Sequence, residues 1–456
     1  MEAEKERNGL KQACCYNGCC LFFFPNKHCG KAVCCWIAVV VVLTIVASFK
    51  VWYYAFGALL GQGLEKELRD VIPKSIETDD WGPVEEIYND YPFLGQSVLI
   101  VGGKNGRLTV SRGNGKIAEK DQKMPIASAS KWVSATVVYC VIEDPNSNLT
   151  TESRPGDYFP FWSCSNPADK RCTDITVEKL LAFRHGLSAE VERDFTDGDW
   201  EAYVEKVFNE PYDQSRFDTF EYGSVGLYVG GLMALKEKQK QANYTNANWD
   251  DLLEECVSIP ATITDAPKRY DAFSNGKFTY DYDFQTKSSN GYNPGFPGLG
   301  GSMGASPNQY ANFLEAFMNK ELVTANSVYE MTRPHGDTGK TFGFDPEELE
   351  ERFGITAFQE YAQGMWHAGE NVTHSLGYFG FFPWLDQSAS NSTDHFYGVL
   401  AIQAEEQLAL IMSIAGPVIL LPITALAALF TFLCLSHRNE RKRTEESETI
   451  VKNDDI

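Results

Sequence analysis

Two long uncharged stretches near the ends of the chain constrain its organisation more than any other feature. The first covers residues 33–49 and the second residues 408–435. A helix of about 20 apolar residues spans the hydrocarbon core of a membrane, so each stretch is long enough to cross a bilayer. We therefore expect transmembrane helices at residues 32–56 and 406–436, with a large folded domain between them.

Basic residues flank both stretches on the side of the chain ends. Lys27 and Lys31 precede the first stretch, and four basic residues follow the second: Arg438, Arg441, Lys442 and Arg443. The positive-inside rule then places both termini in the cytosol and the intervening domain outside the cell or in a lumen. A cleaved signal peptide is the alternative for the first stretch, but its leader is long and Cys-rich for one, so we favour an uncleaved anchor. The second span alternatively begins near Gly416.

This topology divides the chain into six segments. A helix over residues 59–72, stopped by Pro73, is expected to begin the stalk between membrane and domain. The predicted segments are a cytosolic Cys-rich tail (1–31), a transmembrane helix (32–56), a helical stalk (57–90), a folded domain (91–405), a second transmembrane helix (406–436) and a charged cytosolic tail (437–456).

The charge balance excludes one class of partner. The chain has 62 acidic and 40 basic residues and a formal charge of −22. A surface that binds nucleic acid needs a basic stripe, and the sequence shows none, so we predict no nucleic-acid partner. No cluster of His, Asp or Glu has the spacing of a metal site, and we predict neither a metal nor another cofactor.

Sites of modification agree with the predicted topology. Four N-glycosylation sequons lie between the two spans, with acceptors Asn148, Asn243, Asn371 and Asn391. Seven of the 12 cysteines lie in the first 35 residues. Adjacent Cys pairs beside a membrane favour reversible palmitoylation over a zinc site, because they lack the usual two-residue gap between ligands. The predicted acceptors are Cys14, Cys15, Cys19 and Cys20.

The remaining cysteines of the domain fall into two groups. Cys164 and Cys172 bracket a short loop and suit a disulfide in an oxidising compartment. Cys140 falls in a predicted helix and Cys256 follows one, so we expect both to be buried free thiols.

The domain itself alternates between strand and helix patterns. Residues 97–101 and 108–111 predict a hairpin around Asn105-Gly106, and residues 396–402 predict a late strand. The expected helices cover 130–142, 175–183, 220–236, 307–318 and 346–353. Residues 265–300 are rich in Gly, Asn and Tyr without periodicity and predict a long surface loop. An early hairpin, central helices and late strands together predict an α+β domain.

A Ser-x-x-Lys tetrad begins the helix at 130–142. In "MPIASASKWV" (124–133), Ser128 lies three residues before Lys131 and in the predicted first turn, so the two side chains share one helix face. The helix dipole there favours a developing oxyanion, and burial would lower the pKa of Lys131 and make it a usable base. The spacing alone is weak, since Ser274 and Lys277 repeat it in a turn. The alternative is a Ser N-cap with Lys131 reaching solvent.

Six stretches in order carry a wider resemblance. They are SVLIVGGKNGRLTVSRGNG (97–115), MPIASASK (124–131), DITVEKLLAFRHGLS (174–188), FEYGSVGLYVGGLM (220–233), GLGGSMGASPNQYANFL (298–314) and HSLGYFGFFPWLD (374–386). This series resembles serine β-lactamase-related hydrolases: class C β-lactamases, D-Ala-D-Ala carboxypeptidases and related esterases. The resemblance implies a β-lactamase-like fold, a mainly antiparallel sheet flanked by helices with a helical subdomain.

The resemblance also implies roles for individual residues. Ser128 matches the nucleophile that is acylated, Lys131 its activating partner, and Tyr222 a general base or proton shuttle. The resemblance also assigns substrate binding or the oxyanion hole to Ser224, His374, Ser375 and Gly377. The oxyanion hole is expected from two backbone N–H groups, that of Ser128 and one on the strand at 374–380.

Two motifs depart from the family pattern. The family's Tyr-x-Asn stands here as Tyr222-Gly223-Ser224, and a hydroxyl lacks the second group of an amide. The third motif, Lys or His, then Thr or Ser, then Gly, stands here as His374-Ser375-Leu376, with glycine only at Gly377.

Other candidates for the third motif are weaker. His367-Ala368-Gly369 has the glycine but lacks the strand that should follow, and Lys340-Thr341 precedes Phe342. Residues 337–341 form no phosphate loop, because Pro334 stands where its first glycine is required. We expect His185 to pack or to cap its turn.

These features predict a membrane-anchored serine hydrolase that acts on an ester or amide through an acyl-enzyme. The altered motifs favour a small-molecule, peptide or lipid-derived substrate over an antibiotic. The alternative is a catalytically silent hydrolase fold that serves as a binding or scaffold domain, because the substitutions at Ser224 and Leu376 change the motifs.

Overall fold

The computed structural model of the protein describes most of the predicted domain. The described residues are 61–91, 94–113, 119–188, 199–263, 298–301, 303–339, 345–353, 356–369, 371–377, 380–388 and 395–402. All of them belong to one compact unit, Tyr53–Leu410. The predicted membrane spans, both tails, the palmitoylation sites and Asn391 lie outside these residues.

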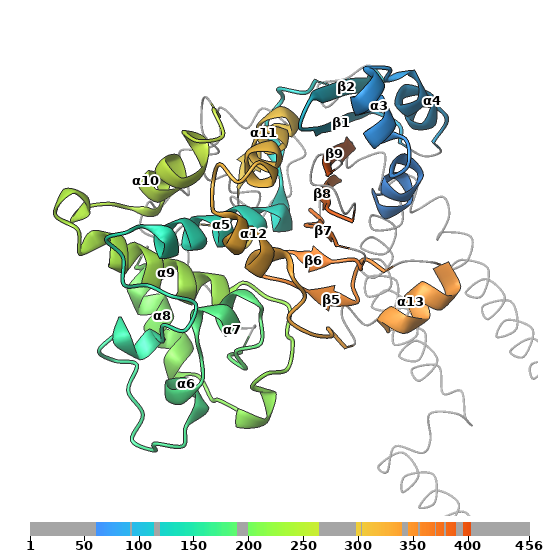
Figure 1. Ribbon diagram of the computed structural model, residues 1–456. Helices are drawn as coiled ribbons and strands as arrows, with labels where there is room; N and C mark the ends of the chain where they lie inside the picture. Colours follow the sequence, from blue (N-terminus) through green and yellow to red (C-terminus); the bar gives the residue numbers. More distant parts are fainter. Residues whose placement is uncertain are drawn as a thin grey trace, which may run out of the picture. The chain divides into compact units, whose positions relative to one another are not determined.

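Strands from both ends of the domain form its central sheet (Figure 1). Among the described residues, seven antiparallel strands lie in the order β2-β1-β9-β8-β7-β6-β5. Their bounds are β1 Ser97–Gly103, β2 Gly106–Arg112, β5 Glu360–Tyr361, β6 Trp366–His367, β7 Val372–His374, β8 Phe381–Asp386 and β9 Phe396–Ile402. A separate pair joins β3 (Met124–Pro125) to β4 (Gly304–Ala305).

The hairpin that the sequence predicts is present and supplies the middle of the sheet. Every residue of β1 is buried, which agrees with its continuous apolar run. Its partner β9 is also buried throughout and matches the predicted strand at 396–402. Because β1 pairs with β9 across about 300 residues of chain, the sheet joins distant parts of the sequence.

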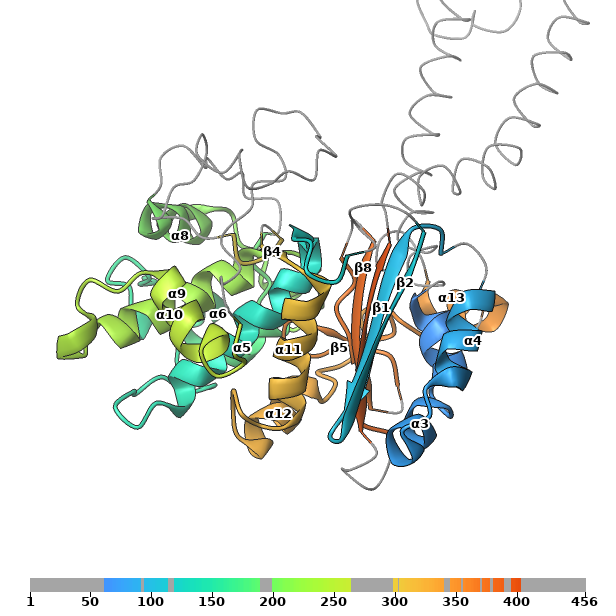
Figure 2. The same cartoon turned by 90° about the horizontal axis from the view of Figure 1, so that it is seen from above.

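Helices cover both faces of this sheet. Figure 2 shows α5 (Ser130–Glu143), α11 (Pro307–Met318) and α12 (Ala325–Thr332) on one face. On the other face lie α3 (Ile72–Thr78), α4 (Gly82–Asp90) and α13 (Pro346–Phe353). The remaining helices extend beyond α5 as a helical subdomain: α6 Lys170–Thr173, α7 Val177–Leu181, α8 Trp200–Asn209, α9 Val225–Gln239 and α10 Trp249–Leu253.

The segment expected to form a stalk is part of the folded domain instead. A helix described from residue 61 to 68 buries Leu64 and Leu68 completely, and α4 buries Tyr88, which hydrogen-bonds Ser97 at 2.7 Å. Pro73 lies in the first turn of α3 and so begins a helix, where its missing N–H costs nothing. The apolar face that suggested a stalk helix packs on the sheet.

The described residues contain two disulfides. Cys164 pairs with Cys172, as the sequence predicts. Cys140 of α5 pairs with Cys256, which lies in the π-helical turn Glu254–Ser258. The expectation of free thiols at these two positions was wrong, because 116 residues of chain bring the turn after α10 back against α5, a contact that no local pattern reveals.

The described helices and surfaces bear on the membrane and glycan predictions only in part. None of the helices within the described residues has the length and apolar character needed to cross a bilayer. Three predicted glycan acceptors, Asn148, Asn243 and Asn371, are exposed.

Candidate active site

Ser128 lies in a tight turn that leads directly into α5. The 3-10 turn Ala127–Ala129 is closed by hydrogen bonds from the Ala129 N–H to the Ile126 carbonyl (3.0 Å) and from the Ser130 N–H to the Ala127 carbonyl. Ala127 has φ +45°, a left-handed conformation that costs a non-glycine residue about 1–2 kcal/mol. Ala127 and Ala129 are buried, while Ser128 is half-buried. The strained turn therefore leaves Ser128 partly exposed between two buried alanines.

Lys131 lies in the first turn of α5 and is turned inward. Its side chain is 4% exposed, so the alternative in which it reaches solvent is wrong. The Nζ atom donates a hydrogen bond to Ser128 Oγ at 3.1 Å and another to the carbonyl of Gly300. Because the Gly300 carbonyl can only accept, it holds one N–H of the amine and keeps Nζ within hydrogen-bond distance of Ser128.

The residues around Gly300 are held along the first two turns of α5. Ser134 Oγ donates to the Leu299 carbonyl at 2.9 Å, and the Met303 N–H donates to Ser130 Oγ at 3.2 Å. Leu299 is completely buried. The predicted surface loop therefore ends as a buried segment at 298–300, while its residues 265–297 lie outside the described part of the chain.

Two neighbouring glycines in this segment give a matched test. A Cβ at Gly300 would lie 1.9 Å from Ser224 Oγ, whereas a Cβ at Gly301 would meet its nearest atom, in Ala127, at 3.8 Å. We expect Gly300→Ala to displace the carbonyl that holds Lys131 and to lower turnover about 100-fold. Gly301→Ala is expected to stay within about threefold of wild type. Equal turnover in the two variants, measured with an ester substrate, would refute this role of Gly300.

Tyr222 lies beside Lys131, as the sequence predicts. The expected helix at 220–236 begins only at Val225, so Tyr222 is on the preceding loop rather than on a helix. The Nζ of Lys131 lies 4.9 Å from the centroid of the Tyr222 ring, a cation–π distance. The structure thus brings together Ser128, Lys131 and Tyr222 from two separate segments of the chain.

Ser224 occupies the N-cap position of α9 and contacts Gly300. Its hydroxyl packs against the Cα of Gly300, which is the contact that excludes a side chain there. Ser224 therefore supports the backbone that binds Lys131, a different role from the substrate contact expected from the motif.

Ser375, directly after β7, contacts the turn that carries Ser128. Its Oγ donates to the carbonyl of Ser128 at 3.0 Å. Gly377 lies against the same turn, where a Cβ would come within 2.5 Å of the Ile126 carbonyl. The Gly377 N–H, however, donates to the Phe381 carbonyl at 2.7 Å, so the expectation that it contributes to an oxyanion hole was wrong.

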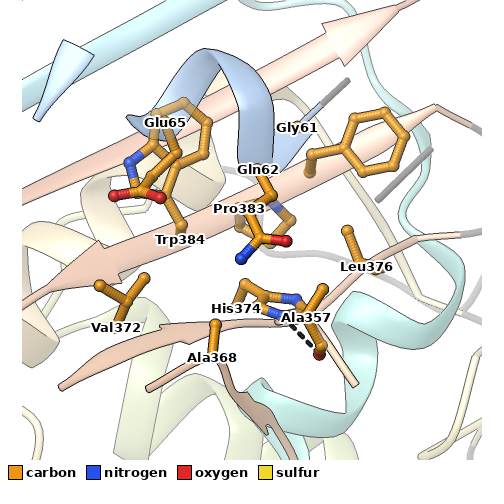
Figure 3. Close-up of a pocket in the computed structure, with 11 residues that line it drawn as sticks. Gly61, Gln62, Glu65, Ala357, Ala368, Val372, His374, Leu376, Pro383 and Trp384 are labelled. Carbon is orange, nitrogen blue, oxygen red and sulfur yellow. Dashed lines mark hydrogen bonds between the residues drawn. The ribbon is translucent and has the colours of Figure 1, made fainter. Parts of the chain in front are cut away.

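His374 points away from Ser128, contrary to the prediction that it contacts substrate. Successive side chains of a strand face opposite sides of a sheet, so the orientation of Ser375 sends His374 to the other face. There it lines a small pocket with Gly61, Gln62 and Glu65, and its Nε2 atom hydrogen-bonds the Ala357 carbonyl at 2.9 Å (Figure 3). This pocket does not include Ser128 or Lys131.

Burial of His374 makes a prediction for stability against pH. Burial lowers the pKa of His374 from 6.5 to about 4. Between pH 6.5 and pH 4 the imidazole is therefore protonated in the unfolded chain but neutral in the folded chain. Stability from this group is therefore present at pH 7 and is lost as the pH falls toward 4, by about 3 kcal/mol.

Glu65 in the same pocket opposes this trend. Burial raises its pKa to about 7, against the lowering effect of Arg69, so its contribution falls as the pH rises from 4.5 to 7. The effect of His374 must therefore be measured as the difference between wild type and His374→Gln in urea unfolding. We expect this difference in the free energy of unfolding to grow in favour of wild type between pH 4 and pH 7. A difference that is independent of pH would contradict the burial of a neutral imidazole.

Two further histidines of the described residues, His185 and His367, have structural partners. His185 is buried and its Nδ1 accepts the Leu187 N–H at 3.0 Å, which is the turn-capping role that the sequence predicts. His367, the alternative third-motif residue, pairs with Glu360 at 3.0 Å. Among the described residues, no three His, Cys, Asp or Glu side chains gather as metal ligands.

Sequence reasoning missed residues that hold the site through apolar or backbone contacts. Tyr310 of α11 donates to the Ala129 carbonyl at 2.9 Å, and Trp366 of β6 stacks on Tyr222 with ring centroids 5.1 Å apart. Tyr310 stands in the stretch 298–314 but received no role from it, and Trp366 stands in none of the six stretches; only the fold places them beside Ser128 and Tyr222.

The arrangement of sheet and helices is that of the β-lactamase-like fold. A candidate β-lactamase from Bacteroides dorei has this fold at a TM-score of 0.52 and 18% identity, over 71% of this chain and 91% of that one. At this identity the likeness establishes the fold alone.

Two further solved structures are more distant. FmtA from Staphylococcus aureus has a TM-score of 0.46 at 13% identity, over 78% of this chain and 87% of its own. A penicillin-binding protein from Bacillus halodurans has a TM-score of 0.46 at 16% identity, over 72% and 99%. At these scores neither likeness supports an argument. No family model matches the chain, and no curated protein matches it.

Proposed function

We propose that the domain is a serine hydrolase in which Ser128 attacks an ester or amide carbonyl and is acylated. The observation that carries this proposal is the buried Lys131 amine, 3.1 Å from the Ser128 hydroxyl and held there by Gly300. A serine hydroxyl is a weak nucleophile until a base shares its proton, and this amine is placed to be that base. The β-lactamase-like fold adds support.

The proposed acylation uses residues that lie together. Lys131, as the neutral amine, takes the proton of Ser128 as the Oγ–carbon bond forms, and the carbonyl electrons move to the substrate oxygen. Collapse of this tetrahedral species expels the leaving group, which receives the proton by way of Tyr222. Water then attacks the acyl-enzyme, with Lys131 and Tyr222 acting jointly as base, and regenerates the Ser128 hydroxyl.

The position of Ser128 before α5 suits a developing negative charge. The backbone N–H of Ser128 makes no hydrogen bond to another described residue, and it lies at the N-terminal end of a 14-residue helix. Such an N–H is one expected donor to an oxyanion. The second donor, on the segment that follows His374, stays a prediction, since residues 378–379 lie outside the described part of the chain.

A non-catalytic binding or scaffold domain is the second candidate. The orientation of His374 toward the opposite face and the engaged N–H of Gly377 favour it, because both remove groups that the motif comparison assigned to substrate.

We further propose that this domain is an ectodomain anchored by the segments at 32–56 and 406–436, with both termini cytosolic. The disulfides Cys140–Cys256 and Cys164–Cys172 support an oxidising compartment, and the exposed sequon residues support glycosylation. The proposed substrate is a small-molecule, peptide or lipid-derived ester or amide.

Hydrolysis of nitrophenyl esters with graded acyl chains tests the catalytic proposal. Full-length wild type is expected to release nitrophenol catalytically, and the acyl-length profile reports the size of the substrate pocket. Ser128→Ala is expected to reduce the rate to that of buffer. If wild type and Ser128→Ala were equally inactive in this assay and in amide hydrolysis, the binding-domain candidate would replace the enzyme.

A further inference from the structure

The ring of Tyr222 is held within a cluster of aromatic side chains. Trp366 stacks on it with centroids 5.1 Å apart and an interplanar angle of 19°. Phe183 and Tyr361 meet it edge-on, at 5.8 Å and 6.0 Å. These contacts come from β5, β6 and the turn after α7, so three separate parts of the chain confine one ring.

Trp366 is itself fixed. It is 2% exposed, and Tyr361 and Phe358 contact it edge-on at 4.9 Å and 5.1 Å. Aromatic pairs of this kind stabilise the packing beyond the effect of the area that they bury. A tryptophan packed in this way is a rigid surface, and the ring that stacks on it has little freedom to tilt.

The stacking of Trp366 on Tyr222 matters because Tyr222 belongs to neither a helix nor a strand. The residue lies on the loop before Val225, where backbone hydrogen bonds of a helix do not set its orientation. Lys131 Nζ lies only 4.9 Å from the ring centroid, so a tilt of the ring changes the relation between the phenol and the amine that share the proton. Misplacement of a catalytic group by about 1 Å can cost about 100-fold in rate.

We propose that Trp366 is a positioning residue that holds the Tyr222 phenol in register with Lys131. This role rests on the proposed hydrolase function. It acts on the transfer of a proton and not on the binding of substrate, because Trp366 reaches the site through the ring of Tyr222.

Turnover of a nitrophenyl ester by Trp366→Leu and Trp366→Phe in the full-length protein tests this role. Leucine fills space but cannot stack, so we expect kcat to fall about 10- to 100-fold with KM changed less than about threefold. Phenylalanine keeps an aromatic face that can stack on Tyr222, so we expect the kcat of Trp366→Phe to stay within about threefold of wild type. Trp249→Leu is the matched control, since Trp249 is 3% exposed and its ring contacts Trp200.

The outcomes separate the two proposals. A wild-type protein without turnover would overturn the hydrolase function, and the positioning role with it. Normal wild-type turnover together with an unchanged kcat in Trp366→Leu would overturn the positioning role alone. Equal losses in Trp366→Leu and Trp366→Phe, or an equal loss in Trp249→Leu, would also overturn it, because they would indicate a general effect of core damage.

Discussion

Replacement of Lys131 by methionine is expected to slow acylation of Ser128 by about 1,000-fold, since general-base catalysis contributes on the order of 10²–10⁴. The methionine side chain fills the same buried space without an amine. Stability should change by less than about 2 kcal/mol, because the unpartnered Gly300 carbonyl is offset by removal of a buried amine. Single-turnover ester cleavage and urea unfolding measure the two effects.

Lys240→Met is the matched control for Lys131→Met. Lys240 is 55% exposed at its side chain and pairs with Glu237 on the subdomain, away from Ser128. Because Glu237 is only 1% exposed, loss of its partner is expected to cost about 1–3 kcal/mol of stability, but acylation should be unaffected. Full acylation by Lys131→Met would show that another group activates Ser128. A parallel loss of activity and of folding would show that Lys131 is structural.

Loss of the Cys140–Cys256 disulfide is expected to lower the free energy of unfolding by about 4–5 kcal/mol. The bond closes a loop of 116 residues, and the entropy that a cross-link removes from the unfolded chain grows with loop length. It also joins the last turn of α5, the helix of Lys131, to the turn after α10. Urea unfolding of the Cys140→Ser, Cys256→Ser double variant measures the loss.

The second disulfide provides an internal comparison. Cys164–Cys172 spans only 8 residues, so its removal should cost about 2–3 kcal/mol by the same entropy. A greater cost for the short loop than for the long one would contradict this account of the cross-links. An unchanged stability after removal of Cys140 and Cys256 would indicate that the two thiols are not paired in solution.

Elements with strong local signals could be predicted from the sequence. The hairpin at β1 and β2, the helix α11 at Pro307–Met318 and the strand β9 agree with the predicted ranges. Each is specified by its own periodicity and by turn or capping residues. For α11, Ser306 and Gln309 form a capping box, and proline occupies the first turn.

The start of α9 shows where the local pattern misleads. Residues 220–224 have the spacing of apolar and polar residues that predicts a helix. They form a loop instead, because the Glu221 N–H donates to the carbonyl of Phe183, which is distant in the sequence. This places Tyr222 against the sheet. The same limitation applies to the predicted stalk, because Leu64 and Leu68 of this segment are completely buried in the folded domain.

The sequence predicted the three candidate reactive side chains of the site but not the residues that hold them in place. Ser128, Lys131 and Tyr222 were found because their residue types and order resemble a known motif series. The prediction that His374 contacts substrate was wrong, because strand register decides which face of the sheet a side chain takes and a motif does not specify that register. Gly300, Tyr310 and Trp366 act through a carbonyl, a hydroxyl and a stacked ring, and no spacing in the sequence distinguishes these from ordinary packing.

Mapping of a fluorophosphonate adduct by peptide mass spectrometry tests the central claim most directly. The full-length protein should carry one adduct, on Ser128, which is absent from Ser128→Ala and forms slowly in Lys131→Met. An adduct on a different residue, or equal labelling of wild type and Ser128→Ala, would contradict the assignment of Ser128 as the nucleophile.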